Sequence, residues 1–88
     1  MADYVLRWSK QVLKELDRLP QKIADRVYGH VTALSKSPRT PGALKLKGGS
    51  DNWRIRIRDY RVLYTIDDAV RIISILAVQH RKDVYRGL

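Results

Sequence analysis

The stretch "NWRIRIRDYRVLYTI", residues 52–66, decides the fold class because its side chains change character at every second position. Three apolar residues alternate with three arginines: Trp53, Ile55 and Ile57 against Arg54, Arg56 and Arg58. Successive side chains of a β-strand point to opposite faces, so this alternation predicts a strand with one face buried and the other exposed. The residues "DY" at 59–60 predict a tight connection to a second strand, and the stretch as a whole therefore predicts a β-hairpin.

The outward face of this hairpin carries more positive charge than folding requires. Lys45 and Lys47 alternate with leucines in the preceding segment, residues 43–48, and we expect both lysines on the face of the arginines. Like charges that lie opposite each other on neighbouring strands destabilise a sheet. We therefore interpret the face as a phosphate-binding surface, except that Arg58, beside the turn, is expected to pair with Asp59.

The segments on either side of the hairpin predict the other elements. Residues 3–8, "DYVLRW", alternate like a short strand, and Ser9 is a suitable N-cap for the helical pattern that follows it. Pro20 splits the helical region into two helices, and the second pattern continues to "SKSPRTPG" at 35–42. Residues 70–78, "VRIISILAV", are apolar on both faces, which predicts a strand inside the sheet.

Together these segments predict one α+β domain that spans residues 1–88. Its expected order is an N-terminal strand, an antiparallel helical hairpin and then three to four antiparallel strands, with the helices packed on one face of the sheet. A chain of this length buries a single modest core and leaves no room for a second domain or a large cofactor pocket.

Composition restricts the function classes further. The net charge of +9 is uneven: residues 1–38 hold seven basic and four acidic residues (+3), and residues 39–88 hold eleven and five (+6). A charge of this size favours a polyanionic partner.

The absence of cysteine excludes disulfides and thiolate metal sites, and we expect no metal and no cofactor. No apolar run reaches the roughly 20 residues of a membrane span, and we expect a cytoplasmic protein that binds no membrane.

Two motifs resemble those of the RelE family of toxin–antitoxin toxins, within the wider RelE/ParE superfamily. They are "LKG…WRIRIRDYRVLYTID", from residue 46, and "ILAVQHRKDVYR", residues 75–86. The similarity extends over nearly the whole chain, including the proline-split helices. The most specific patterns are W-R-I-R-x-x-D-Y-R-V-x-Y and the terminal H-R-x-[DE]-V-Y.

The resemblance implies a toxin that enters the decoding site of the ribosome and cuts mRNA there without a metal. In such a reaction the ribose 2′-OH attacks the neighbouring phosphodiester. The cognate partner that neutralises the toxin would be an acidic antitoxin. The family's functional positions correspond here to Arg54, Arg56, Arg61, Arg81 and Tyr85. Arg54 and Arg56 would bind phosphate, Arg61 and Arg81 would take part in catalysis, and Tyr85 would stack on a base or pack the tail onto the sheet.

The chain departs from the family pattern at the proton acceptor. The best-understood family members carry lysine among the alternating cations, whereas the chain has arginine at both positions, and a guanidinium group stays protonated at neutral pH. His80 is the better candidate for proton transfer, because imidazole both accepts and donates protons near neutral pH. Lys45, Lys47, solvent or the RNA itself are the alternatives.

Two other functions remain open from the sequence. A ParE-like toxin would share the fold but inhibit gyrase instead of cutting RNA. A non-catalytic module would have kept the fold for binding RNA or a protein partner, and the missing lysine is the main argument for it.

Overall fold

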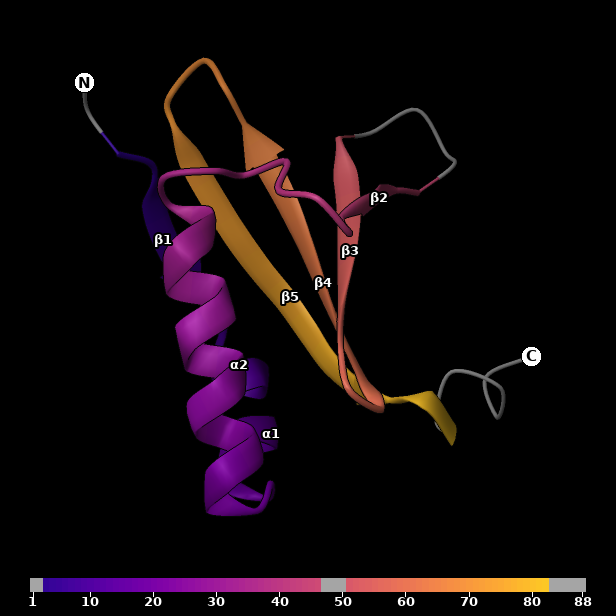
Figure 1. The fold of residues 1–88 in the computed structure, drawn as a ribbon. Coiled ribbons are helices and arrows are strands. Elements are labelled where there is room, and N and C mark those ends of the chain that lie inside the picture. The colour runs from indigo at the N-terminus through magenta and orange to yellow at the C-terminus, as the bar shows by residue number, and fades with distance from the viewer. Residues whose placement is uncertain (1–2, 47–50, 83–88) are drawn as a thin grey trace.

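The computed structural model describes residues 3–46 and 51–82, which form one sheet and two helices (Figure 1). In chain order the elements are β1 (Val5–Trp8), α1 (Lys10–Asp17), α2 (Gln21–Leu34), β2 (Leu44–Lys45), β3 (Asn52–Ile57), β4 (Tyr60–Asp67) and β5 (Ile72–His80). The strands lie in the order β1-β5-β4-β3-β2. Strands β2 to β5 are antiparallel, as predicted, whereas β1 pairs in parallel with β5 and makes the sheet mixed.

The helices begin and end where local chemistry favours it. The Ser9 side chain accepts a hydrogen bond from the Val12 backbone N–H at 3.1 Å, which satisfies one of the free donors at the start of α1. Pro20 is the N-cap of α2, a position where the missing backbone N–H of proline does no harm. The predicted break between the two helices is therefore confirmed.

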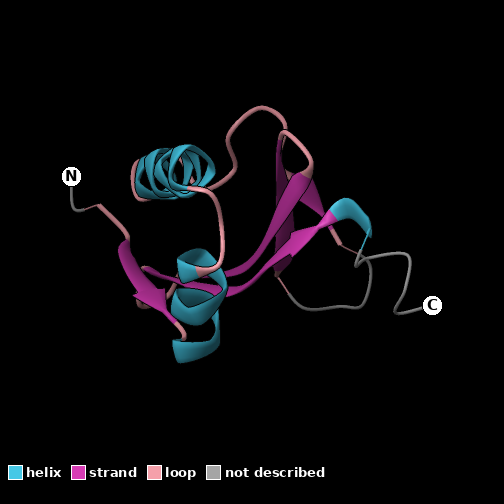
Figure 2. Cartoon of the chain, turned by 90° about the horizontal axis from the view of Figure 1, so that it is seen from below, coloured by secondary structure: helices cyan, strands magenta, loops and turns pink. Residues whose placement is uncertain are grey.

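The core lies between the helices and one face of the sheet. Its fully buried members include Val12 of α1, Val27 and Val31 of α2, and Val62 and Ile73 of the sheet. The buried residues of β3 and β4 alternate with exposed or half-buried ones, and the described residues leave the second face of the sheet uncovered. Figure 2 shows that the sheet reaches beyond both helices on the side of β3. No helix in the described ranges is long and apolar enough to cross a membrane.

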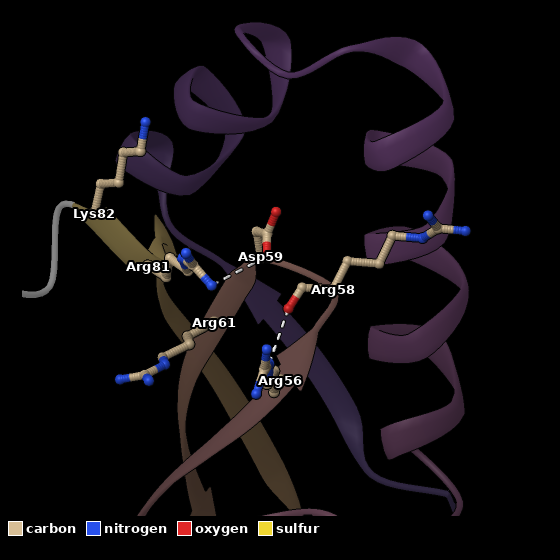
Figure 3. A pocket seen from close by; sticks show the side chains of 6 residues that line it. All are labelled: Arg56, Arg58, Asp59, Arg61, Arg81 and Lys82. Atoms are coloured by element: carbon tan, nitrogen blue, oxygen red, sulfur yellow. Dashed lines mark hydrogen bonds and ion pairs between the residues drawn. The ribbon is translucent and has the colours of Figure 1, made fainter.

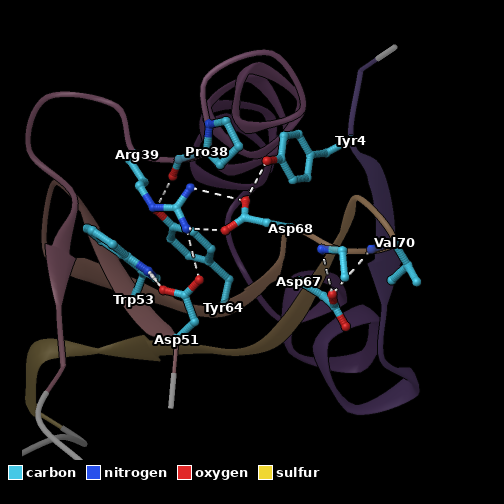
Figure 4. A network of polar contacts seen from close by, with 10 residues as sticks. Tyr4, Pro38, Arg39, Asp51, Trp53, Tyr64, Asp67, Asp68 and Val70 are labelled. Atoms are coloured by element: carbon cyan, nitrogen blue, oxygen red, sulfur yellow. Dashed lines mark hydrogen bonds and ion pairs between the residues drawn. The ribbon is translucent and has the colours of Figure 1, made fainter. Parts of the chain in front are cut away.

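A network of polar contacts holds the loop after α2 against the sheet (Figure 4). The buried Tyr64 hydroxyl donates to the Pro38 carbonyl oxygen at 2.8 Å. The Arg39 guanidinium lies 2.9 Å from an Asp51 carboxylate oxygen and 2.8 Å from one of Asp68. The hydrogen bond from Arg39 holds the pKa of Asp68 below its ordinary value of 3.8. This network fixes the path of the chain into β2, which is an edge strand of only two residues.

The hairpin turn lies one residue earlier than the sequence predicted. β3 ends at Ile57 and β4 begins at Tyr60, so the two turn residues are Arg58 and Asp59 rather than residues 59–60. Arg58 has a φ of +55°, in the left-handed region. This conformation costs an L-residue other than glycine or asparagine about 1–2 kcal/mol.

Candidate functional site

The uncovered face of the sheet carries arginines from neighbouring strands. Arg56 of β3 lies directly opposite Arg61 of β4, and Arg54 lies opposite Leu63. Because Ile55 and Ile57 between them are buried against the core, the three arginines point to the uncovered face. The prediction that the arginine alternation has a buried and an exposed side is confirmed.

The β3–β4 turn holds two arginines in place. The Nε of Arg56 donates to the backbone oxygen of Arg58 at 3.0 Å. The backbone N–H of Arg81, the first residue after β5, donates to the backbone oxygen of Asp59 at 2.7 Å. The Arg81 Nη1 also lies 3.9 Å from the Asp59 Oδ1. The ion pair of Asp59 is thus with Arg81, and the predicted pairing with Arg58 is wrong.

A cavity of about 410 Å³ opens between the turn and the end of β5 (Figure 3). Its lining residues are Arg56, Arg58, Asp59, Arg61, Arg81 and Lys82. A second cavity of about 240 Å³ shares Arg56 and Arg61 with the first and adds Gly42, Leu44 and Arg54. We call the two cavities together the arginine groove.

The arginine groove joins four of the predicted site residues. Arg54, Arg56, Arg61 and Arg81 come from two strands and the segment after a third, and all line one or both cavities. Guanidinium groups bind phosphate through two parallel hydrogen bonds, so such a groove suits a phosphodiester backbone. Tyr85 and Lys47, also predicted as site residues, lie outside the described residues.

Lys45 does not lie on the face of the arginines, and this prediction is wrong. The register of β2 and β3 pairs Lys45 with Trp53 and Leu44 with Arg54. Directly opposed residues of neighbouring strands share a face, so Lys45 lies on the face of Trp53. Leu44 takes the place beside the arginines and is 54% exposed there.

His80 is separated from the arginine groove by the sheet. It pairs with Tyr60 across β4 and β5, and its ring packs edge-on against the Tyr60 ring at 4.9 Å. Its Nδ1 accepts a hydrogen bond from the Lys82 backbone N–H at 3.1 Å. His80 lines a different cavity, together with Glu15 of α1. The geometry therefore gives no support to the predicted proton transfer by His80.

A β-bulge explains why His80 faces the helices. Tyr64 pairs with Ile75 and Leu63 with Ala77, so Leu76 is an extra residue in β5. An extra residue reverses the alternation for the rest of its strand. After the bulge Val78 is buried, and His80 shares its face.

Sequence reasoning missed two residues that line the larger cavity. The sequence pattern predicts Asp59 only as a partner of Arg58 and predicts no role for Lys82, yet both line this cavity. The signal for Asp59 is its position in the turn of the arginine-rich hairpin, where its side chain must lie at the end of both strands. Lys82 follows Arg81 directly, so any site that includes Arg81 was a reason to consider it.

Comparisons with known proteins find relatives in sequence and in fold. The family model described as "ParE toxin of type II toxin-antitoxin system, parDE" matches residues 6–85. The toxin RelG of Mycobacterium tuberculosis is 32% identical over 84 residues, which are 94% of this chain and 97% of the relative. Two solved structures are also similar in fold and sequence.

The first of these structures is the archaeal RelE–RelB complex from Pyrococcus horikoshii. It has a TM-score of 0.82 and 31% identity, over 90% of this chain and 96% of that chain. The second is the toxin–antitoxin complex RelBE2 from Mycobacterium tuberculosis, with a TM-score of 0.79 and 30% identity, over 90% of this chain and 99% of that chain. The similarity in sequence and fold therefore extends over most of the chain.

Proposed function

Because the chain belongs to the RelE family of type II toxin–antitoxin toxins, within the RelE/ParE superfamily, we propose that it is an endoribonuclease that cuts mRNA in the decoding site of the ribosome. The observation that carries the proposal is the arginine groove. Arg56, Arg61 and Arg81 surround one cavity, although Arg81 is twenty residues from Arg61 in the sequence.

The proposed reaction is attack of a ribose 2′-OH on the neighbouring phosphodiester. Negative charge builds up on the phosphoryl oxygens in the transition state, and fixed cations stabilise that charge more than they stabilise the ground state. Arg61 and Arg81 supply these cations. Arg54 and Arg56 bind the phosphates on either side, and Tyr85 stacks on a base to orient the RNA.

The ribosome explains why a groove this open can be catalytic. The side chains of Arg81 and Asp59 are 58% and 60% exposed, so water screens their charges in the free protein. Enclosure of the groove between the ribosome and the mRNA would exclude that water and strengthen each charge interaction. We therefore expect cleavage of ribosome-bound mRNA and little cleavage of free RNA.

The proposed inhibitor is an acidic antitoxin. The two solved structures compared above are complexes of a toxin with its antitoxin. The arginine groove and the net charge of +9 attract an acidic segment in the way they attract RNA. An antitoxin segment that covers Arg56 and Arg61 would block the groove directly.

The test is to add the purified protein to a translation extract and map the cuts on mRNA, with and without ribosomes. We expect Arg61→Ala and Arg81→Ala each to lower the cleavage rate by about 10²–10³, the usual loss when one group that stabilises transition-state charge is removed. Arg26→Ala removes the same charge from the exposed surface of α2 and is the matched control. Full cleavage by both groove variants would refute the site.

The same preparation distinguishes the two alternative functions. The matching family model describes ParE toxins, so a gyrase supercoiling assay is run beside the cleavage assay. Inhibition of gyrase without cleavage of RNA would replace the nuclease by the ParE-like activity. If the protein neither cuts RNA nor inhibits gyrase but still binds RNA, its function is that of a non-catalytic binding module.

A further inference from the structure

The larger cavity of the arginine groove contains a single carboxylate among its described lining residues. Five of the six residues are cations, namely Arg56, Arg58, Arg61, Arg81 and Lys82, and the sixth is Asp59. Neither a guanidinium nor an ammonium group has a lone pair that can accept a proton. Asp59 is thus the one described group of this cavity that can act as a base at neutral pH.

The fold holds Asp59 beside the groups that would bind the substrate. Asp59 is the second residue of the tight turn, and its backbone oxygen accepts the Arg81 N–H at 2.7 Å. Its carboxylate Oδ1 lies 3.9 Å from the Arg81 Nη1, and 60% of its side chain is exposed (Figure 3). A phosphate bound by Arg81 would bring the adjoining ribose hydroxyl to this side of the cavity.

The other nearby bases face the helices instead. The His80 ring packs against Tyr60, and its Nδ1 already accepts the Lys82 N–H. The Glu15 Oε1 accepts the Val78 backbone N–H at 3.4 Å, which holds this carboxylate against the edge of β5. Both side chains line a cavity that contains none of the groove arginines. A substrate in the arginine groove is therefore closer to Asp59 than to either group.

We propose that Asp59 is the proton acceptor of the cleavage reaction, a role that rests on the proposed nuclease function. The Asp59 carboxylate takes the proton of the attacking 2′-OH while a bond forms between the 2′-oxygen and phosphorus. The bond between phosphorus and the 5′-oxygen breaks, and the leaving oxygen takes a proton from water. The products are a 2′,3′-cyclic phosphate and a 5′-hydroxyl end, and Asp59 returns its proton to the solvent.

A base in the turn compensates for the lysine that is missing from the strand. With arginine at 54 and 56, the strand cations bind and neutralise phosphate but cannot accept the proton. The turn between the strands supplies the missing base, only two residues from Arg61. Positioned general bases typically contribute about 10²–10⁴ to a rate, so loss of the Asp59 carboxylate must be visible in kcat.

The experiment measures cleavage of ribosome-bound mRNA by the full chain and three variants. Asp59→Asn keeps the shape and the turn preference of the residue but removes the base. Asp59→Glu keeps the carboxylate, and Asp25→Asn makes the same charge change on the exposed surface of α2 as a control. We expect Asp59→Asn to lower kcat by about 10²–10³ with an unchanged KM, and Asp59→Glu to recover part of that loss.

Each of the other possible results shows whether the role of Asp59 or the nuclease function is wrong. If Asp59→Asn cuts within about threefold of the unmodified chain, the proton acceptor is another group, and the nuclease function stands. A rise in KM at constant kcat would mean that Asp59 contributes only to binding of the substrate, which overturns the proposal. If the unmodified chain cuts no RNA, the nuclease function itself is refuted. Asp59→Ala replaces Asp59→Asn should the latter melt before the assay temperature.

Discussion

Arg56 and Arg61 lie directly opposite each other on β3 and β4, and this pair should weaken the free protein. Two unit charges about 6 Å apart repel by about 0.7 kcal/mol in water, and by more where the local dielectric constant is lower. Opposite-charge pairs across strands contribute about 0.2–1 kcal/mol, and like charges directly opposite each other destabilise the sheet. We therefore expect Arg56→Gln, or Arg61→Gln, to raise the free energy of unfolding by about 0.5–1 kcal/mol at low ionic strength.

Thermal unfolding measures this effect. For a domain of this size, 1 kcal/mol corresponds to about 4–8 °C in Tm, so each single variant should melt about 2–8 °C higher. The double variant should gain little more than one single variant, because the repulsion is already gone, and a double-mutant cycle measures that difference. At about 1 M salt the Debye length falls to about 3 Å, and the gain should largely disappear.

A matched control separates the pair from the general loss of charge. Arg7 of β1 lies on the same uncovered face, but its partner in β5 is Ser74. Arg7→Gln should therefore change Tm by less than either groove variant at low salt. The coupling energy between Arg56 and Arg61 should be unfavourable and should fall with salt. A coupling energy of zero, or one that does not depend on salt, would refute the reasoning that the two arginines repel each other until an anionic partner binds.

Three further predictions concern the polar contacts that support the fold. Tyr64→Phe should lower the free energy of unfolding by about 1 kcal/mol, since the Pro38 carbonyl loses its donor, and denaturant titration checks this. Burial raises the pKa of Tyr64 from 10.0 to about 12, so its contribution to stability should persist below pH 10 and be lost as the pH rises through about 12. Because the hydrogen bond from Arg39 lowers the pKa of Asp68, stability from this pair should be lost as the pH falls below 3.8, and Asp68→Asn should remove that dependence in acid unfolding curves. Ser9→Ala should cost about 1 kcal/mol through loss of the N-cap, measured by thermal unfolding.

Local chemistry accounts for the parts of the fold that the sequence predicted correctly. The alternation from Trp53 to Ile57 has period two, so the buried face of β3 follows from strand geometry alone. Ser9 and Pro20 mark the helix starts because capping and proline sterics depend on a few neighbouring residues. Arg54 and Arg56 belong to the groove for the same local reason.

The strand register and the β-bulge account for where Lys45 and His80 lie. Lys45 faces away from the arginines because the pairing of β2 with β3 aligns Lys45 with Trp53. That pairing depends on how the intervening loop closes, and a slip of one residue would exchange the two faces. His80 is predicted from the sequence to transfer protons, but the extra residue in β5 turns it towards the helices.

The sequence by itself therefore determined the elements, the buried face of β3 and the outward direction of its arginines, because each depends on residues close together in the chain. Only the tertiary structure decided which charged groups meet. Arg81 lies beside Asp59 because β5 pairs with β4 in a register that aligns Tyr60 with His80, and this pairing joins segments twenty residues apart. Pairing between distant segments depends on the packing of the whole domain, and this packing sets the one carboxylate of the described cavity among its cations.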